Sequence, residues 1–172
     1  GYVYSSKYLS EEDAESELRR YWKGKNLDGI DSLKIRFETG KLSFTWVKNC
    51  IAIGLAGGFI EPLESTGLAI TQIGIEMAAS MLDARCYDQE IVDRYNAHLS
   101  KFYTDIMEFI ISHYAFTSRE DTPFWRAVKH KTVVPPKLQA RLEIFRRYLP
   151  TSSTKGTAEV FMFRDISWFA VL

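Results

Sequence analysis

The chain has 172 residues, of which 46% are hydrophobic and 14% aromatic, and its 22 basic residues balance 22 acidic ones. This composition excludes a disordered tail and suits one folded domain. The zero net charge disfavours a nonspecific nucleic-acid binder, and no segment approaches the roughly 18 to 20 apolar residues of a membrane span. Cys50 and Cys86 are too few for a disulfide framework or a four-cysteine zinc site, so we expect a cytoplasmic setting.

The two ends of the sequence are apolar. Residues 1–4 (GYVY) predict a strand, and residues 167–172 (SWFAVL) form an apolar run. Because chain termini are more often polar and frayed, we expect this chain to be a segment of a larger protein.

The first third alternates between helix and strand patterns. Ser10 followed by three acidic residues predicts a helix start, and the helix should run through Trp22 and end at Gly24. Alternating apolar residues on both sides of Thr39-Gly40 predict a hairpin over residues 35–46. The unbroken apolar run 50–53 predicts a strand that is buried on both faces.

A glycine-rich loop follows that run. Gly54, Gly57 and Gly58 allow positive φ angles or close approach of a ligand, and Ser65 and Thr66 are capping residue types before a helix. Amides at a helix start attract anions, but the loop matches neither G-x-G-x-x-G nor the P-loop. Two interpretations therefore stay open, an anion or cofactor site and a purely structural turn.

Two carboxylates, Glu61 and Glu64, flank a proline in the same loop. They could cap the following helix and complement its dipole. Alternatively, one of them could act as a base or a positioning group with an environment set by partial burial. The residues alone favour capping.

The remainder of the chain predicts helices. These are expected over residues 68–82 and 91–113, from Pro123 onward, and after Pro135-Pro136, and residues 152–156 should form a loop. The expected fold class is α+β, with a strand-rich N-terminal third before a mostly helical region.

Other polar features favour structural interpretations. His98 and His113 are expected to pack on the long helix rather than bind a metal, and no metal site is predicted. The basic stretch 119–155 fits amphipathic helices with solvated faces better than a nucleic-acid surface. Cys50, in the buried-strand interpretation, should be an inert apolar residue.

Residues 46–67, WVKNCIAIGLAGGFIEPLESTG, resemble the signature of the flavin-dependent halogenases of the tryptophan halogenase family. Residues 1–6 and 167–172 are similar to family segments in the same order. The resemblance implies a C-terminal portion of such an enzyme. Residues 1–67 would be the last strands and the cofactor-facing loop of an FAD-binding α/β fold, and residues 68–172 a helical region that covers the substrate.

The resemblance also implies a chemistry. In the family, reduced FAD and oxygen convert a halide, chloride or bromide, into hypohalous acid, which reaches an electron-rich aromatic substrate through a tunnel. A lysine in the N-terminal part holds the electrophilic halogen, and a glutamate positions it and can accept the ring proton. By motif, that glutamate is Glu64. The implied halide neighbours are Thr66 and Gly67, and the implied flavin neighbours are Gly54, Gly57, Gly58, Thr66 and Gly67.

The chain departs from the family pattern in three ways. It contains no G-x-G-x-x-G, no W-x-W-x-I-P and no lysine in the context of the catalytic one. Alone, it should therefore neither hold FAD tightly nor turn over. Its expected partners are the missing N-terminal part of the same protein and a separate flavin reductase, and a homodimer is compatible with the sequence.

The substrate is the least defined feature. Family members acting on free tryptophan clamp it with an acidic residue and a Phe-Trp pair, which residues 158–163 do not reproduce, although Glu159 lies there. Phe163 and Trp168 are the expected substrate contacts. An indole, pyrrole or phenol is expected, either as a small molecule or bound to a carrier. The alternatives are a flavin monooxygenase that hydroxylates, and a noncatalytic helical interaction module.

Overall fold

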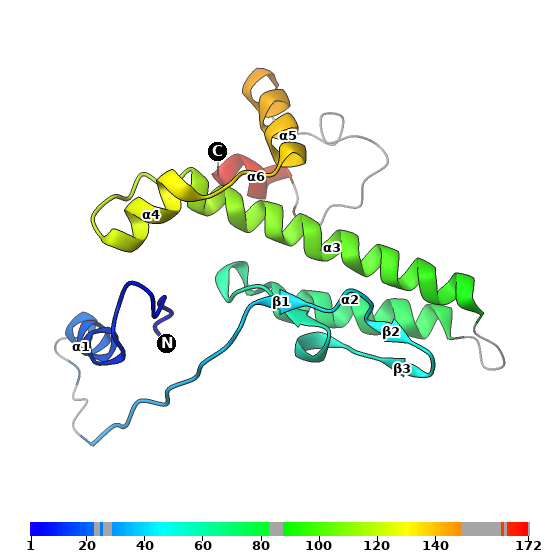
Figure 1. Cartoon of the computed structure of the whole chain (residues 1–172), viewed down its shortest axis with the longest axis horizontal. Coiled ribbons are helices and arrows are strands. Elements are labelled where there is room, and N and C mark those ends of the chain that lie inside the picture. The colour runs from blue at the N-terminus through cyan, green and yellow to red at the C-terminus, as the bar shows by residue number, and fades with distance from the viewer. Residues whose placement is uncertain (23–24, 26–28, 83–87, 149–162, 164, 172) are drawn as a thin grey trace.

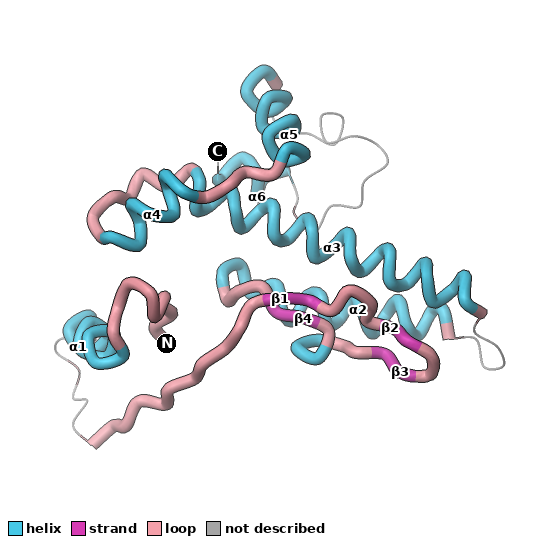
Figure 2. Tube along the Cα trace, in the orientation of Figure 1, coloured by secondary structure: helices cyan, strands magenta, loops and turns pink. Residues whose placement is uncertain are grey.

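The computed structural model describes residues 1–22, 25, 29–82, 88–148, 163 and 165–171. In this part of the chain, helices predominate (Figures 1 and 2). The helices are α1 (Glu11–Tyr21), α2 (Thr66–Met81), α3 (Gln89–Ala115), α4 (Pro123–Lys131), α5 (Pro136–Arg147) and α6 (Asp165–Val171), with short 3-10 turns η1 (Gly54–Ala56) and η2 (Leu63–Ser65). The strands have two residues each: β1 (Gly40–Lys41), β2 (Trp46–Val47), β3 (Cys50–Ile51) and β4 (Gly58–Phe59).

The long helix α3 is the axis of the fold. Figure 1 shows α2 and the short strands along one side of α3, with α4, α5 and α6 on the other. Asp88 begins α3 by accepting a hydrogen bond from the Ile91 amide. The helices predicted over residues 68–82 and 91–113 and after Pro123 and Pro135-Pro136 are confirmed.

Two apolar clusters hold α3 in place. One joins α3 to α2 and to the strand region, and the other joins α3 to α5 and α6. The buried members of the first are Trp46, Ile70, Ala78, Val92, Tyr95, Leu99, Tyr103, Ile106 and Ile110. Those of the second are Phe109, Leu138, Leu142 and Trp168. The first cluster extends into the segment that precedes α2. Burial of its apolar side chains against α3 therefore holds the glycine-rich loop against α3.

The N-terminal third contains less strand than expected. β1 pairs with β4, and β2 pairs with β3 in a hairpin whose turn contains Lys48 at φ 53°. The prediction of a hairpin around Thr39-Gly40 is wrong, because Gly40 pairs with Phe59 instead. The predicted strand over residues 1–4 is also not observed, since within the described residues no neighbouring strand pairs with it. The expectation of a strand-rich first third is not met by these four short strands.

The predicted buried strand 50–53 is also wrong. Only Cys50–Ile51 is strand, and Cys50 lies exposed on a two-stranded hairpin. A two-stranded hairpin leaves one face to solvent, whereas burial on both faces requires layers above and below. The unbroken apolar run belongs instead to the approach to the glycine-rich loop.

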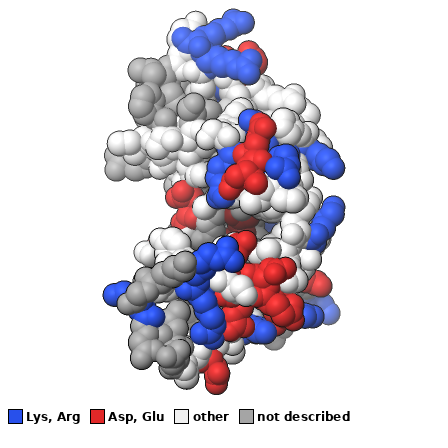
Figure 3. Space-filling view, turned by 90° about the vertical axis from the view of Figure 1, so that its left-hand side faces the viewer, with Lys and Arg blue, Asp and Glu red and all other residues white. Residues whose placement is uncertain are grey.

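The predicted N-terminal helix is confirmed as α1. Ser10 accepts a hydrogen bond from the Asp13 amide at 3.1 Å, and the helix ends at Tyr21, earlier than the predicted end at Gly24. Gly24 and the predicted loop 152–156 lie outside the described residues. Figure 3 shows acidic and basic side chains side by side on the face that carries α1 and α4. Glu11, for example, lies 3.1 Å from Lys34. Among the described helices, none combines the length and apolarity needed to cross a bilayer.

Candidate functional site

The glycine-rich loop is packed tightly against its own chain. Gly54 has a φ of +63°, and a Cβ there would lie 2.9 Å from Thr71 Oγ1. At Gly57 a Cβ would lie 2.9 Å from the Ala52 carbonyl oxygen, and at Gly58 it would lie 2.8 Å from Lys41 Cα. The absence of side chains at these positions therefore follows from close backbone packing. Contact of the three glycines with a cofactor stays a prediction.

Two residues with left-handed backbone conformations end this loop. Glu64 has φ 64° and ψ 6°, and Ser65 has φ 51° and ψ 31°. Neither is glycine, so each conformation costs about 1 kcal/mol or more. Ser65 occupies the N-cap position of α2, yet its side chain makes no capping hydrogen bond. The turn thus precedes α2 without supplying a side-chain cap.

Glu64 is directed toward the C-terminal end of α3. Its Oε1 lies 3.2 Å from Nε2 of His113, and the Glu64 side chain is 40% exposed while that of His113 is 22% exposed. Glu64 is therefore neither turned outward without a partner nor sealed inside the core. A carboxylate that is partly exposed and has one fixed partner can still contact a ligand.

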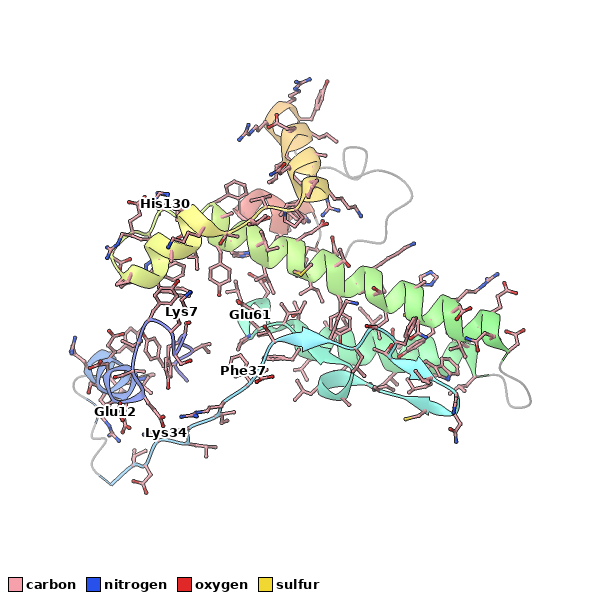
Figure 4. All side chains as sticks on the ribbon, viewed as in Figure 1. Lys7, Glu12, Lys34, Phe37, Glu61 and His130 are labelled. Atoms are coloured by element: carbon pink, nitrogen blue, oxygen red, sulfur yellow. The ribbon has the colours of Figure 1, made fainter. Side chains whose placement is uncertain are left out.

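Glu61 makes a parallel contact with the next residue of α3. The Tyr114 hydroxyl lies 2.8 and 2.9 Å from the two carboxylate oxygens of Glu61 and donates to that carboxylate (Figure 4 shows Glu61 beside α3). Burial raises the pKa of Glu61 above its ordinary value, while the bonds from Tyr114 and the charge of His113 oppose this rise. Burial and the Glu61 contact also raise the pKa of Tyr114, so its hydroxyl remains the donor.

These contacts rule out capping, one of the two interpretations of the carboxylates, and the other, a base or positioning group, stays a prediction. Within the described residues, Glu61 and Glu64 contact side chains of α3, and no hydrogen bond from a backbone amide of α2 to either is observed. They therefore do not cap α2. The first turn of α2 begins with the buried Thr66, and Gly67 follows it.

Gly67 differs from the loop glycines. A Cβ built there would meet no atom of the described chain within 4 Å. Its backbone is helical and unstrained, so neither packing nor conformation within this chain requires glycine. Open space therefore lies next to an uncapped helix start, two residues beyond the strained turn.

The two predicted substrate residues lie in the packing around Phe109. Phe163 stacks on Phe109 with centroids 3.8 Å apart, and the fully buried Trp168 contacts it edge to face at 4.9 Å. The Phe109 ring also contacts His113 at 4.8 Å. Phe163 and Glu64 are thus linked through α3, whereas contact of Phe163 or Trp168 with a substrate stays a prediction.

Sequence reasoning missed the partners of the two carboxylates. His113 and Tyr114 lie 49 and 53 residues beyond Glu64 and Glu61, and no local spacing connects residues that far apart. The apolar face of α3 predicts that this helix is packed against other elements, but not which segment its end contacts. Within the ranges that the structure describes, no group of three or more His, Cys, Asp or Glu could hold a metal ion.

Comparisons with known proteins agree on one family. A sequence model described as tryptophan halogenase matches residues 1–172. The tryptophan 6-halogenase ThaL of Streptomyces albogriseolus is 34% identical over 152 residues, covering 88% of this chain and 28% of that protein. The tryptophan 7-halogenase RebH of Lentzea aerocolonigenes is 32% identical, covering 85% and 27% respectively. The chain thus spans less than a third of the length of these relatives.

Solved structures give the same result. The tryptophan 6-halogenase SttH of Streptomyces toxytricini superposes with a TM-score of 0.91 at 32% identity, over 99% of this chain and 33% of that one. BrvH, a flavin-dependent halogenase from Brevundimonas sp. BAL3, superposes with a TM-score of 0.81 at 34% identity, over 98% and 33%.

Proposed function

Because the chain belongs to the tryptophan halogenase family, we propose that the protein carrying it is a flavin-dependent halogenase. It uses reduced FAD, oxygen and chloride or bromide to halogenate an electron-rich aromatic compound, with a separate reductase supplying the reduced flavin. The placement of Glu64 is the observation that carries this proposal. A strained turn before α2 places its carboxylate 3.2 Å from His113, in the last turn of α3.

The start of α2 fits an anion and a flat cofactor. Its first amides carry the positive end of the helix dipole without a side-chain cap. Open space at Gly67 lets a ligand approach the backbone, and the buried Thr66 fixes that backbone. In this proposal Thr66 and Gly67 would border the halide and the flavin, and the reduced flavin would activate oxygen, which is the oxidant for the halide.

The role of Glu64 follows from aromatic substitution. When a halogen adds to a ring carbon, that carbon must lose a proton before the ring becomes aromatic again. A carboxylate placed at the ring edge can accept that proton and orient the incoming halogen. Glu64 fits this task because its side chain is held by His113 while 40% of its surface stays accessible.

The division of labour along the chain is also part of the proposal. Residues 1–67 would face the cofactor as the end of the FAD-binding fold, and residues 68–172 would cover the substrate. Phe163 supports this arrangement because it stacks on Phe109, next to His113. The substrate class is an indole, pyrrole or phenol, and tryptophan is the substrate named for ThaL and RebH.

The test uses the complete protein that carries this chain. Supplied with reduced FAD, oxygen and bromide, it should brominate one member of an aromatic panel. Glu64→Gln should lower kcat by about 10²-fold or more, because general-base catalysis contributes on that order. Glu12→Gln, the same exchange on the exposed side of α1, is the matched control (Figure 4).

Two outcomes would overturn the proposal. A hydroxylated product whose formation does not need bromide would identify a monooxygenase instead. Turnover that is unchanged in Glu64→Gln would remove the role assigned to this carboxylate.

A further inference from the structure

The two ring nitrogens of His113 have different partners. Nδ1 lies 2.9 Å from the carbonyl oxygen of Phe109, one turn earlier in α3. Nε2 lies 3.2 Å from Oε1 of Glu64. The Phe109 ring packs edge to face against the imidazole with centroids 4.8 Å apart. The carbonyl oxygen and the ring of Phe109 therefore restrict the orientation of the His113 ring independently of Glu64.

Both partners of the His113 ring are oxygen acceptors. A carbonyl oxygen only accepts, so Nδ1 must donate to Phe109. A carboxylate oxygen accepts, so in the 3.2 Å contact with Glu64 the side that can donate is Nε2.

Only one oxygen of Glu64 is used in this contact. His113 takes Oε1, and among the described residues no hydrogen bond or ion pair to Oε2 is observed. Glu61 does not compete for His113, since both of its oxygens lie within 2.9 Å of the Tyr114 hydroxyl. Consecutive residues of α3 thus hold the two carboxylates of the loop separately.

We infer that His113 is a positioning residue that fixes Glu64 through Oε1 and leaves Oε2 to face the reacting ring. This inference rests on the proposed function. His113 acts through Glu64 and does not itself contact the substrate. A long, flexible glutamate loses rotamer entropy when it is held, and a fixed donor supplies that restriction before the substrate arrives.

Kinetics of the complete protein test this role with two substitutions. His113→Phe keeps the packing against Phe109 but removes the donor, and we expect kcat to fall by about 10²-fold with little change in KM. His113→Gln keeps an N–H group within reach of Glu64 and should recover most of that loss. A residue that only supports the fold would show no such recovery.

His98 provides the matched control on the same helix. Its Nδ1 lies 2.8 Å from the carbonyl oxygen of Arg94, the same one-turn contact that His113 makes. Unlike His113, it has no carboxylate partner among the described residues. His98→Phe and His98→Gln should both leave kcat unchanged.

A second measurement does not depend on flavin or turnover. In ¹⁵N-imidazole NMR spectra of the flavin-free protein, the Nε2–H resonance of His113 should lie downfield because of its hydrogen bond. Glu64→Gln should move it upfield and leave the signals of His98 in place.

The outcomes separate this inference from the proposed function. Absence of halogenation by the wild-type protein would defeat the proposed function, while the NMR result would still test the contact. Halogenation with full kcat in His113→Phe would overturn the positioning role alone. Equal losses in His113→Phe and His113→Gln, or an Nε2–H signal that Glu64→Gln does not move, would overturn it as well.

Discussion

The side chain of Asn96 takes the place of a second strand partner for Trp46, which pairs with Ile51 of β3. Its Oδ1 accepts from the Trp46 amide at 2.9 Å and from the Thr45 amide at 2.8 Å, and its Nδ2 donates to the Trp46 carbonyl at 2.8 Å. One buried amide on α3 therefore satisfies three backbone groups at the start of β2. This contact connects the strand region to the axis of the fold.

Removing that amide should be costly. Asn96→Ala removes three hydrogen bonds to buried backbone groups of Thr45 and Trp46, at about 1 to 3 kcal/mol for each. We expect the free energy of unfolding, measured by urea denaturation, to fall by about 3 kcal/mol or more. Gln72→Ala removes an exposed bond to Glu76 and should change it by less than about 0.5 kcal/mol. Similar losses in the two variants would contradict the bridging role of Asn96.

The helices were predictable because their signals are local. Ser10, Thr122 and Asp88 cap helices through contacts within three residues, and the apolar positions of α3 repeat at helical spacing. The short strands were not predictable in the same way. Gly40 pairs with Phe59 across 19 residues, and Asn96 replaces a second strand for Trp46 across 50. Alternating apolar residues indicate which face of a strand is buried, but they do not indicate which strand pairs with it.

The candidate site likewise has features that its local sequence predicts and features that depend on contacts with distant residues. The loop motif identified Glu64 as a candidate site residue, and the sequence around Glu64 predicted that a helix follows. Its left-handed backbone and its contact with His113 depend on how α3 packs against α2, which no spacing within the loop encodes.

The loop glycine Gly58 and the helix glycine Gly67 should respond differently to alanine. In Gly58→Ala the new Cβ would lie 2.8 Å from Lys41 Cα, so β1 and β4 must separate and stability should fall by about 1 to 3 kcal/mol. Gly67→Ala meets open space and should leave the melting temperature unchanged or slightly raised. Halogenation by Gly67→Ala should nonetheless weaken if ligands approach this backbone. Full activity together with full stability would argue against a ligand at Gly67.

The stability of the protein should depend on the ionisation of Glu61. Burial raises its pKa above the ordinary value of 4.5, so the folded state binds this proton more tightly than the unfolded state does. The free energy of unfolding therefore falls as pH rises from that ordinary value through the raised one. Glu61→Gln cannot ionise, so its stability relative to wild type should increase with pH across this window.

Tyr114→Phe removes the hydroxyl that contacts Glu61 and should change the pH dependence of stability in the opposite direction to Glu61→Gln. Its hydroxyl favours the ionised form of Glu61, so removing it should raise the pKa of Glu61 further and extend the fall in stability to higher pH. Urea denaturation at a series of pH values measures both variants. Parallel curves for wild type and Glu61→Gln would mean that Glu61 has the same proton affinity in both states.

Arg141 should be the most sensitive charged residue of the helical region. It lies 3.3 Å from Asp105 and 3.1 Å from Glu108, all three are buried, and its guanidinium lies 5.1 Å from the Trp168 ring centroid. Arg141→Met leaves two buried carboxylates without this cation and should cost about 3 to 5 kcal/mol. Arg146→Met, which breaks an exposed pair with Glu143, should cost at most about 1 kcal/mol.

A triple substitution distinguishes two causes of the stability loss expected in Arg141→Met. Changing Arg141 to Met, Asp105 to Leu and Glu108 to Met removes these three charges while keeping similar volumes. If the cost of Arg141→Met comes from uncompensated buried charge, the triple variant should recover most of the lost stability in urea denaturation. If the triple variant is as unstable as Arg141→Met, the loss comes instead from packing of the guanidinium on Trp168, since that contact is absent from both.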